Sequence, residues 1–312
     1  MDSIITNSYP LHFNKSAYKK LNNFVKENNF SKIIVITDSN TTLLCLKKFY
    51  SKFDKTYETY NISFRPGEKN KNLSTCKDLW TNISELGLDR NSLIINLGGG
   101  VVTDLGGFVA STFMRGIKFI NVPTTLLSMV DASIGGKTGI DLNNIKNQIG
   151  VISNPSMVIV DSDFLDTLTL PELKSGFSEM IKHSLITGKK YWESIKLIDI
   201  NSFYPGNCFY NSILIKSKIV DKDPYEKGLR KILNYGHTVG HAIETFCLNS
   251  KTREDLTHGH SIALGMIIEG YLSTIILNFD KQLNKEINRF ILRIFDKLIF
   301  SDEEIEKIIK LM

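Results

Sequence analysis

The sequence predicts an α/β domain with a mostly parallel sheet, followed by an all-α domain. Short β-branched runs alternate with amphipathic stretches up to about residue 170, a pattern typical of a Rossmann-like domain with helices on both faces of its sheet. Beyond that point the strand signals stop and helical spacing continues. We therefore expect domains at 1–170 and 171–312, divided at "LTLPELKSG", where Pro171 can begin a helix.

The expected elements follow in chain order. Strands are predicted where β-branched residues run into glycines or polar residues, at 32–38 ("KIIVITD"), 92–100 ("SLIINLGGG"), 118–125 ("KFINVPTT") and 156–161 ("SMVIVD"). Helices between them are predicted at 40–50 and 72–86. The second half predicts helices at 171–186, 209–222, 229–248, 259–278 and 281–299.

Composition narrows the class of protein. The chain of 312 residues is 42% hydrophobic and 23% charged, and its net charge of +5 is spread without a basic run flanked by aromatic residues. Nucleic acid is therefore not indicated, whereas an anionic small substrate would suit. Four cysteines without CxxC spacing fit a reducing cytoplasm. We find neither a signal peptide nor a membrane segment.

Several expected strands end in residues that can bind a nucleotide. "LGGGVVTDLGGF" (97–108) follows a strand and runs into a helix, where free N–H groups favour a pyrophosphate. A plain tight turn explains the same glycines, so the motif alone is weak. The polar groups expected at this edge of the sheet are Asp38, Gly99, Gly100, Thr124 and Thr125, with Glu68 and Lys71 in the turn "RPGEKNK". Asp38 could bind a ribose hydroxyl.

A glycine-rich segment supplies candidate phosphate ligands. "VDASIGGKTGIDLNNIKNQIG" (130–150) carries Asp131, Lys137, Lys146 and Asn147. Ammonium groups, amides and free backbone N–H groups all favour anions. The alternative is a flexible surface loop with solvated lysines.

Two histidines stand four apart in "NYGHTVGHAIE" (234–244). His237 and His241 would lie on one helical face, which allows joint metal binding. The alternative is a pair in which one histidine is satisfied by its neighbours and the other is exposed to water. Thr238 replaces the Glu that a His-Glu-x-x-His peptidase needs. A Glu and two histidines form a common catalytic zinc set, and the candidates to join it are Glu179, His258 and His260.

A further charged pair lies in "SGFSEMIKHS". Glu179 and Lys182 are three apart on an expected helix. Such a pair in isolation is more often a surface ion pair, and it gains weight only if the histidines join it.

These residues together resemble a known family, the 3-dehydroquinate synthases among the sugar phosphate cyclases. The matching stretches span residues 65–266 in order; they are "PGEKNK", "GGGVVTDLGGFVASTFMRGI", "VPTTLLSMVDASIGGKTGID", "KNQIG", "SGFSEMIK", "GLRKILNYGHTVGHAIE" and "HGHSIALGM". "MVDASIGGKT" and "LNYGHTVGHAIE" are highly specific. The glycine triplet is shared with the wider iron-dependent alcohol dehydrogenase superfamily.

The resemblance implies a role for each matching position. A zinc (or cobalt) site would consist of Glu179, His237 and His258. NAD would contact Asp38, Glu68, Lys71, Gly99, Gly100, Asp104, Thr124, Thr125, Lys146, Phe164, Thr167 and Leu168. The substrate pocket would hold Arg115, Asp131, Lys137, Asn147, Lys182, Lys216, Glu226, Arg230, Asn234 and His241. In the family the residue at Arg115 reaches a neighbouring subunit, which implies a homodimer.

The family reaction converts 3-deoxy-D-arabino-heptulosonate 7-phosphate into 3-dehydroquinate and phosphate, in the shikimate pathway towards aromatic amino acids. NAD transiently oxidises the substrate, phosphate is eliminated, the same NAD reduces the product, and an intramolecular aldol closes the ring. The cofactor is therefore not consumed.

Two departures from the family pattern stand out. His260 occupies the place of a common Glu, beside the expected ligand His258. The sequence also ends at "EEIEKIIKLM", before the Asp-Lys-Lys segment usual in the family, so we expect either a truncated chain or a shortened homologue. The alternatives are another sugar phosphate cyclase, a metal-dependent alcohol dehydrogenase, or a catalytically impaired homologue.

Overall fold

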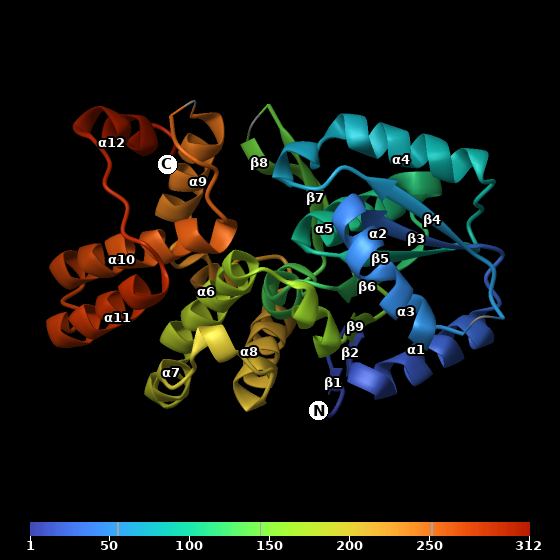
Figure 1. Ribbon diagram of the computed structural model, residues 1–312, viewed down its shortest axis with the longest axis horizontal. Helices are drawn as coiled ribbons and strands as arrows, with labels where there is room; N and C mark the ends of the chain where they lie inside the picture. Colours follow the sequence, from blue (N-terminus) through green and yellow to red (C-terminus); the bar gives the residue numbers. More distant parts are fainter. Residues whose placement is uncertain (55, 144, 251) are drawn as a thin grey trace. The chain divides into compact units, whose positions relative to one another are not determined.

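The computed structural model describes residues 1–54, 56–143, 145–250 and 252–312 and separates into two units (Figure 1). The first unit contains Met1–Leu168 and Lys216–Tyr225, and the second contains Thr169–Ile215 and Glu226–Met312. The second part of helix α8 (Asn207–Lys222) thus groups with the sheet, which the sequence pattern did not predict.

A mostly parallel sheet organises the first unit, as predicted. Its strands in spatial order are β1 (Ile4–Ile5), β2 (Pro10–Phe13), β9 (Val158–Val160), β6 (Lys118–Pro123), β5 (Leu93–Gly98), β3 (Ile33–Asp38) and β4 (Thr59–Phe64). Only the edge pair β1–β2 is antiparallel among these described strands. Strands β1, β2 and β4 were not predicted.

The strand order contains a point where the chain reverses direction across the sheet. The chain passes from β3 to β4 on one side, and then to β5 on the other side of β3. Ligands of open α/β sheets bind beyond the carboxyl ends of the two strands at such a point. Here those strands end at Asp38 and Gly98.

Helices cover the sheet because its central strands are apolar on both faces. The helices of the first unit are α1 (Asn14–Asn28), α2 (Ser39–Leu44), α3 (Leu46–Lys52), α4 (Leu73–Glu85) and α5 (Gly100–Thr112). One core cluster joins strands β3, β4, β5 and β6 to α4 and α5. The helix predicted at 40–50 is divided at Cys45, whose φ of −116° departs from helical geometry.

The segment 130–150 contains a β-hairpin, and its interpretation as a flexible surface loop is wrong. Strands β7 (Lys137–Leu142) and β8 (Ile145–Ile152) pair antiparallel. Gly139 lies opposite Gly150, where a Cβ on either residue would come within 2.6 Å or 2.3 Å of a backbone oxygen. The glycines that suggested a loop are therefore required by the close approach of two strands.

The second unit is helical, as predicted, and its described residues contain no strand. Its other helices are α6 (Leu170–Thr187), α7 (Lys189–Lys196), α9 (His237–Asn249), α10 (His258–Ile276), α11 (Lys281–Ile294) and α12 (Asp302–Ile309). The single helix predicted at 229–248 is wrong. A 3-10 helix at Leu229–Asn234 precedes α9, and Gly236 breaks the path with φ +80°.

Helix α10 is long and apolar enough to span a membrane by length and composition alone. One such helix is weak support for a membrane protein, because the core helix of a soluble domain passes the same test. Residues of α10 from Gly259 to Met266 are largely buried against α6 and α9. We interpret α10 as a partly buried core helix.

A buried carboxylate fastens two helices to the end of β9. Asp161 is fully buried and accepts hydrogen bonds from the Tyr18 hydroxyl at 2.8 Å and from Lys52 Nζ at 2.6 Å. Burial and the neighbouring Asp161 carboxylate raise the pKa of Tyr18 far above that of an exposed phenol. Tyr18 therefore stays protonated and remains a donor.

We predict that Tyr18→Phe lowers the free energy of unfolding of the protein by about 1–2 kcal/mol, because Asp161 loses a donor in a site without water access. Urea denaturation followed by circular dichroism measures this change. Tyr204→Phe removes a hydroxyl from a side chain that is 83% exposed and serves as the control. Equal stability of both variants would contradict the role given to the Asp161 contact.

Candidate functional site

In the first unit, glycines and polar groups lie at the carboxyl ends of β3 and β5, where the strand order of the sheet reverses. Gly99 caps the N-terminus of α5, directly after β5. A Cβ on Gly98 would come within 2.4 Å of Val102, and one on Gly99 within 3.0 Å of Thr125. The glycines thus serve a tight turn, and the same turn leaves the first N–H groups of α5 directed at an anion site.

Asp38 and the residues after β9 lie at element ends. The Asp38 Oδ1 atom accepts from the Thr41 N–H at 2.7 Å and caps α2, a role that the sequence did not predict. Phe164 is buried and Thr167 is half-buried in a 3-10 helix at Ser162–Thr167, with Leu168 following it. Thr124 donates its N–H to the Gly98 carbonyl at 2.9 Å, which holds the ends of β5 and β6 together.

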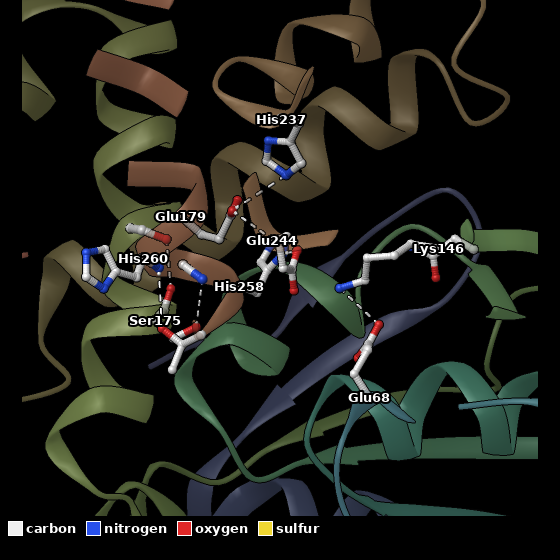
Figure 2. A network of polar contacts seen from close by, with 12 residues as sticks. Glu68, Lys146, Ser175, Glu179, His237, Glu244, His258 and His260 are labelled. Atoms are coloured by element: carbon white, nitrogen blue, oxygen red, sulfur yellow. Dashed lines mark hydrogen bonds and ion pairs between the residues drawn. The ribbon is translucent and has the colours of Figure 1, made fainter. Parts of the chain in front are cut away.

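Lys71 is the centre of a buried ion network in the first unit. Its ammonium lies 2.7 Å from Asp104 and 3.9 Å from Glu68. Glu68 also pairs with Lys146 at 3.1 Å, as Figure 2 shows. Burial by itself lowers the pKa of Lys71, but the carboxylates of Asp104 and Glu68 outweigh it and raise that pKa above its ordinary value. Four of the predicted cofactor-binding residues are therefore in one network.

The same lysine fixes the orientation of Asn147. Lys71 Nζ donates to Asn147 Oδ1, and the Asn147 N–H donates to Asp141 Oδ1 at 2.8 Å. Because the ammonium has only donors, the amide oxygen must face it and the amide NH₂ is directed elsewhere. Asn147 has φ +53°, and Asp141, which sequence reasoning did not identify, stabilises that conformation.

The remaining predicted substrate residues of the first unit differ in exposure. Lys216 is buried and pairs with Asp131 at 2.5 Å, in the turn Ser128–Ala132 after β6. Lys137 begins β7 and is exposed. Arg115 is exposed after α5, in a left-handed conformation with φ +70°.

The second unit brings one carboxylate and two imidazoles together. Glu179 on α6 is fully buried, and its Oε1 lies 3.7 Å from His237 Nε2 and 3.8 Å from His258 Nε2 (Figure 2). Oε1 forms no hydrogen bond to any described residue. A buried carboxylate oxygen facing two imidazole nitrogens fits the donor set of a divalent metal.

His241 joins this cluster of rings. Its ring centroid lies 5.1 Å from that of His237 and 5.5 Å from that of His258, and one ligand atom from each of the three rings lies within 4.8 Å of the others. The spacing of four residues therefore does put both histidines of α9 on one face. Glu179 Oε1 lies within 3.8 Å of an imidazole nitrogen of both His237 and His258.

Glu179 and Lys182 are both buried, so the interpretation as a surface ion pair is wrong. The Lys182 ammonium lies against Glu179 Oε2, and its side chain is 1% exposed. One carboxylate oxygen is thus held by the lysine while the other faces the imidazoles.

The segment before α9 carries the other predicted substrate residues of this unit. Arg230 is buried in the 3-10 helix that ends at Asn234. The Asn234 amide donates to Glu226 Oε1 at 2.6 Å, and Glu226 has φ +56°. This hydrogen bond holds the segment from Glu226 to Asn234, which precedes α9.

His260 points away from the cluster. Its Nε2 lies 2.9 Å from the Asp296 carbonyl, and its ring contacts Phe295 at 5.5 Å. His258 therefore faces Glu179, as the motif position predicted, and His260 connects α10 to the end of α11.

Two further residues position the histidines, and sequence reasoning missed both. Glu269 on α10 accepts the N–H groups of Gly236 at 2.7 Å and Val239 at 3.2 Å, so it caps the first turn of α9 across the helix interface. The Tyr235 carbonyl lies 3.2 Å from His237 Nδ1. No local pattern in the sequence indicates this cap, because Glu269 belongs to a different helix from the residues that it caps.

Close packing of α9 on α10 sets the positions of these histidines. A Cβ on Gly265 would lie 2.0 Å from the Gly236 carbonyl oxygen and 2.8 Å from the Gly240 nitrogen. Backbone atoms cannot move aside as a flexible side chain can, so any larger residue must separate the helices.

We predict that Gly265→Ala lowers the free energy of unfolding by about 2–3 kcal/mol and weakens zinc binding about tenfold or more. Thermal unfolding and zinc titration against a chelator measure the two effects. Gly206→Ala, where the nearest atom to a Cβ is 3.9 Å away, is the matched control. Unchanged zinc affinity in a folded Gly265→Ala variant would contradict the claim that zinc binding depends on the close packing of α9 on α10.

Comparison with known proteins agrees with this arrangement. Residues 61–175 match the family model for the 3-dehydroquinate synthase N-terminal domain, and residues 176–312 match that for the C-terminal domain. The chain belongs to the 3-dehydroquinate synthase family. Similar curated 3-dehydroquinate synthases occur in Parabacteroides distasonis, 37% identical with 96% of this chain and 84% of the relative covered, and in Pelagibacter ubique, 39% identical with 90% and 77% covered.

This 3-dehydroquinate synthase homologue is also similar to proteins of known structure. A 2-deoxy-scyllo-inosose synthase complexed with carbaglucose-6-phosphate, NAD⁺ and Co²⁺ is 26% identical, with a TM-score of 0.86 and 99% of this chain and 86% of that chain covered. A butanol dehydrogenase from Thermotoga maritima is 13% identical, with a TM-score of 0.68 and 99% and 90% covered. The second likeness is one of fold alone.

Proposed function

We propose that this chain converts 3-deoxy-D-arabino-heptulosonate 7-phosphate into 3-dehydroquinate and phosphate, with NAD and one divalent metal ion as cofactors. The observation that carries the proposal is the buried Glu179 Oε1, which faces His237 and His258 without a hydrogen bond among the described residues. It occurs in a chain that matches both domains of the family.

Glu179, His237 and His258 would hold the metal ion, Zn²⁺ or Co²⁺. Three protein ligands leave a coordination position for substrate, and the bound ion supplies Lewis acidity toward a substrate hydroxyl. Lys182 binds the second oxygen of Glu179 and keeps the first directed at the histidines. A related cyclase was solved with Co²⁺ bound, which supports a divalent metal ion in this chain.

The first unit would bind NAD, which supplies reversible hydride acceptance. The α5 N-terminus would bind the pyrophosphate, and Asp38, beside it across β3 and β5, would bind a ribose hydroxyl. The network of Lys71, Lys146, Glu68 and Asp104 provides fixed charges. The other proposed contacts are those of Thr124, Thr125, Phe164, Thr167 and Leu168.

The substrate anions would be held by cations and amides of known orientation. Arg230 offers a planar fork to the carboxylate. Lys137, Arg115 and the amide NH₂ of Asn147, which Lys71 directs away from itself, would bind the phosphate. Lys216 and Asp131 form a pair at 2.5 Å that can orient hydroxyls, while Glu226, Asn234 and His241 would complete the set.

We also propose a cytoplasmic homodimer. Arg115 and the preceding Met114 both have positive φ, +70° and +50°, and both are exposed. Such strain in non-glycine residues is typical of functional segments, and here it would present the Arg115 guanidinium to a second subunit. The four cysteines, which all lie among the described residues, are free, as expected for a reducing compartment.

Phosphate release without net NADH distinguishes a cyclase from an alcohol dehydrogenase. We predict that the purified protein with Zn²⁺ and NAD releases one phosphate per heptulosonate phosphate and accumulates no NADH, because the substrate carries one phosphate and the cofactor is regenerated in each turnover. Phosphate is measured with a coupled assay while absorbance at the NADH band is followed. Steady accumulation of NADH from a simple alcohol, without phosphate release, would exclude the proposal.

Metal content tests the division of roles among the histidines. We predict that Glu179→Ala and His237→Ala lose bound zinc, whereas His241→Ala keeps zinc near wild type and slows turnover, because Glu179 Oε1 lies 3.7 Å from His237 Nε2 and the family resemblance gives the metal to these two residues and His258. Elemental analysis of the dialysed proteins measures this. His260→Ala, which changes the contact to Asp296, is the control. Equal zinc loss from His237→Ala and His241→Ala would contradict the assignment.

A further inference from the structure

Glu244 stands on the same face of α9 as the two histidines. It follows His237 by seven residues and His241 by three, and both spacings return to the same side of a helix. Its side chain is 9% exposed. A carboxylate this deeply buried needs a partner, since desolvation of an unpaired charge costs several kcal/mol.

The partner is an imidazole of the candidate metal centre. Glu244 Oε2 lies 3.1 Å from His258 Nδ1, while the other ring nitrogen, Nε2, faces Glu179 Oε1 at 3.8 Å. Figure 2 shows Glu244 and Glu179 near the same imidazole. A carboxylate has only acceptors at neutral pH, so Nδ1 must carry the proton and Nε2 the lone pair.

The two histidines that face Glu179 are therefore held differently. His237 Nδ1 lies 3.2 Å from the Tyr235 carbonyl, a neutral acceptor that also fixes the Nε2 lone pair. The acceptor of His258 is instead an anion. A carboxylate behind an imidazole orients the ring and makes its free nitrogen a stronger donor to a metal.

We propose that Glu244 is a positioning residue that fixes the tautomer and ring orientation of His258 and strengthens it as a metal ligand. Glu244 acts through His258, because it contacts the ring nitrogen that faces away from Glu179. This inference rests on the proposed metal function of Glu179, His237 and His258.

Zinc affinity of the protein, measured by competition with a chromophoric chelator, tests the inference. We expect Glu244→Gln, which keeps the size of the side chain but removes its charge, to weaken zinc binding about tenfold, and Glu244→Ala to weaken it about 10- to 100-fold. We also expect the visible absorption bands of bound Co²⁺ to shift in both variants, because the donor strength of His258 changes. Glu244→Asp keeps the charge on a side chain that is one methylene shorter, and it should bind zinc more weakly than the wild-type protein.

Glu304→Gln is the matched control. Glu304 of α12 pairs with Arg253, which lies between α9 and α10, at 2.6 Å in the same unit. Its substitution also removes a paired carboxylate but should leave the zinc dissociation constant within about twofold of wild type. Thermal unfolding of the metal-free proteins separates affinity from folding. Wild-type zinc and cobalt binding in Glu244→Gln, with lower metal-free stability, would overturn the positioning role and leave the metal site intact. A wild-type protein that binds no zinc would overturn the proposed function as well.

Discussion

The candidate metal centre depends on how closely three helices approach one another. Glycines occupy the points of contact: a Cβ on Gly259 would lie 2.1 Å from the Ser175 carbonyl oxygen of α6, and one on Gly265 would lie 2.0 Å from the Gly236 oxygen before α9. Gly259 also donates its N–H to the Ser175 hydroxyl at 3.0 Å. Side chains from three helices can meet only because these backbones lie in contact. The glycines of "HGHSIALGM" are therefore required for the close packing of the helices.

Local patterns in the sequence were enough to predict the fold class and to place the central strands. Strands β3, β5 and β6 are largely buried on both faces and consist mostly of apolar residues. Strand β8 was not predicted because its residues are mostly exposed and its pattern has no apolar period. The break at Gly236 was missed for a different reason: the helical spacing continues across it, and only the packing of α10 requires the left-handed turn.

Residue spacing in the sequence predicted the candidate site less well than it predicted the fold. Spacing alone left His237 and His241 equivalent, and it favoured a surface position for Glu179 and Lys182. Resemblance to the family supplied the proposed set of Glu179, His237 and His258, and the structure places Glu179 Oε1 3.7 Å and 3.8 Å from the two histidines. Glu244, Glu269 and Asp141 escaped both approaches, since each acts through another residue across an element boundary. Of the three, only Glu244 had a signal in the sequence, its return to the histidine face after seven residues.

Glu179 has a consequence for the energetics of the protein. Its Oε1 is buried without a hydrogen bond among the described residues, and a desolvated carboxylate oxygen raises the free energy of the folded state. Binding of a cation there relieves that cost only when the second unit is folded, so binding and folding are thermodynamically linked. A metal ion bound at this site would thus raise the folded fraction of the protein and lower its rate of degradation by cellular proteases.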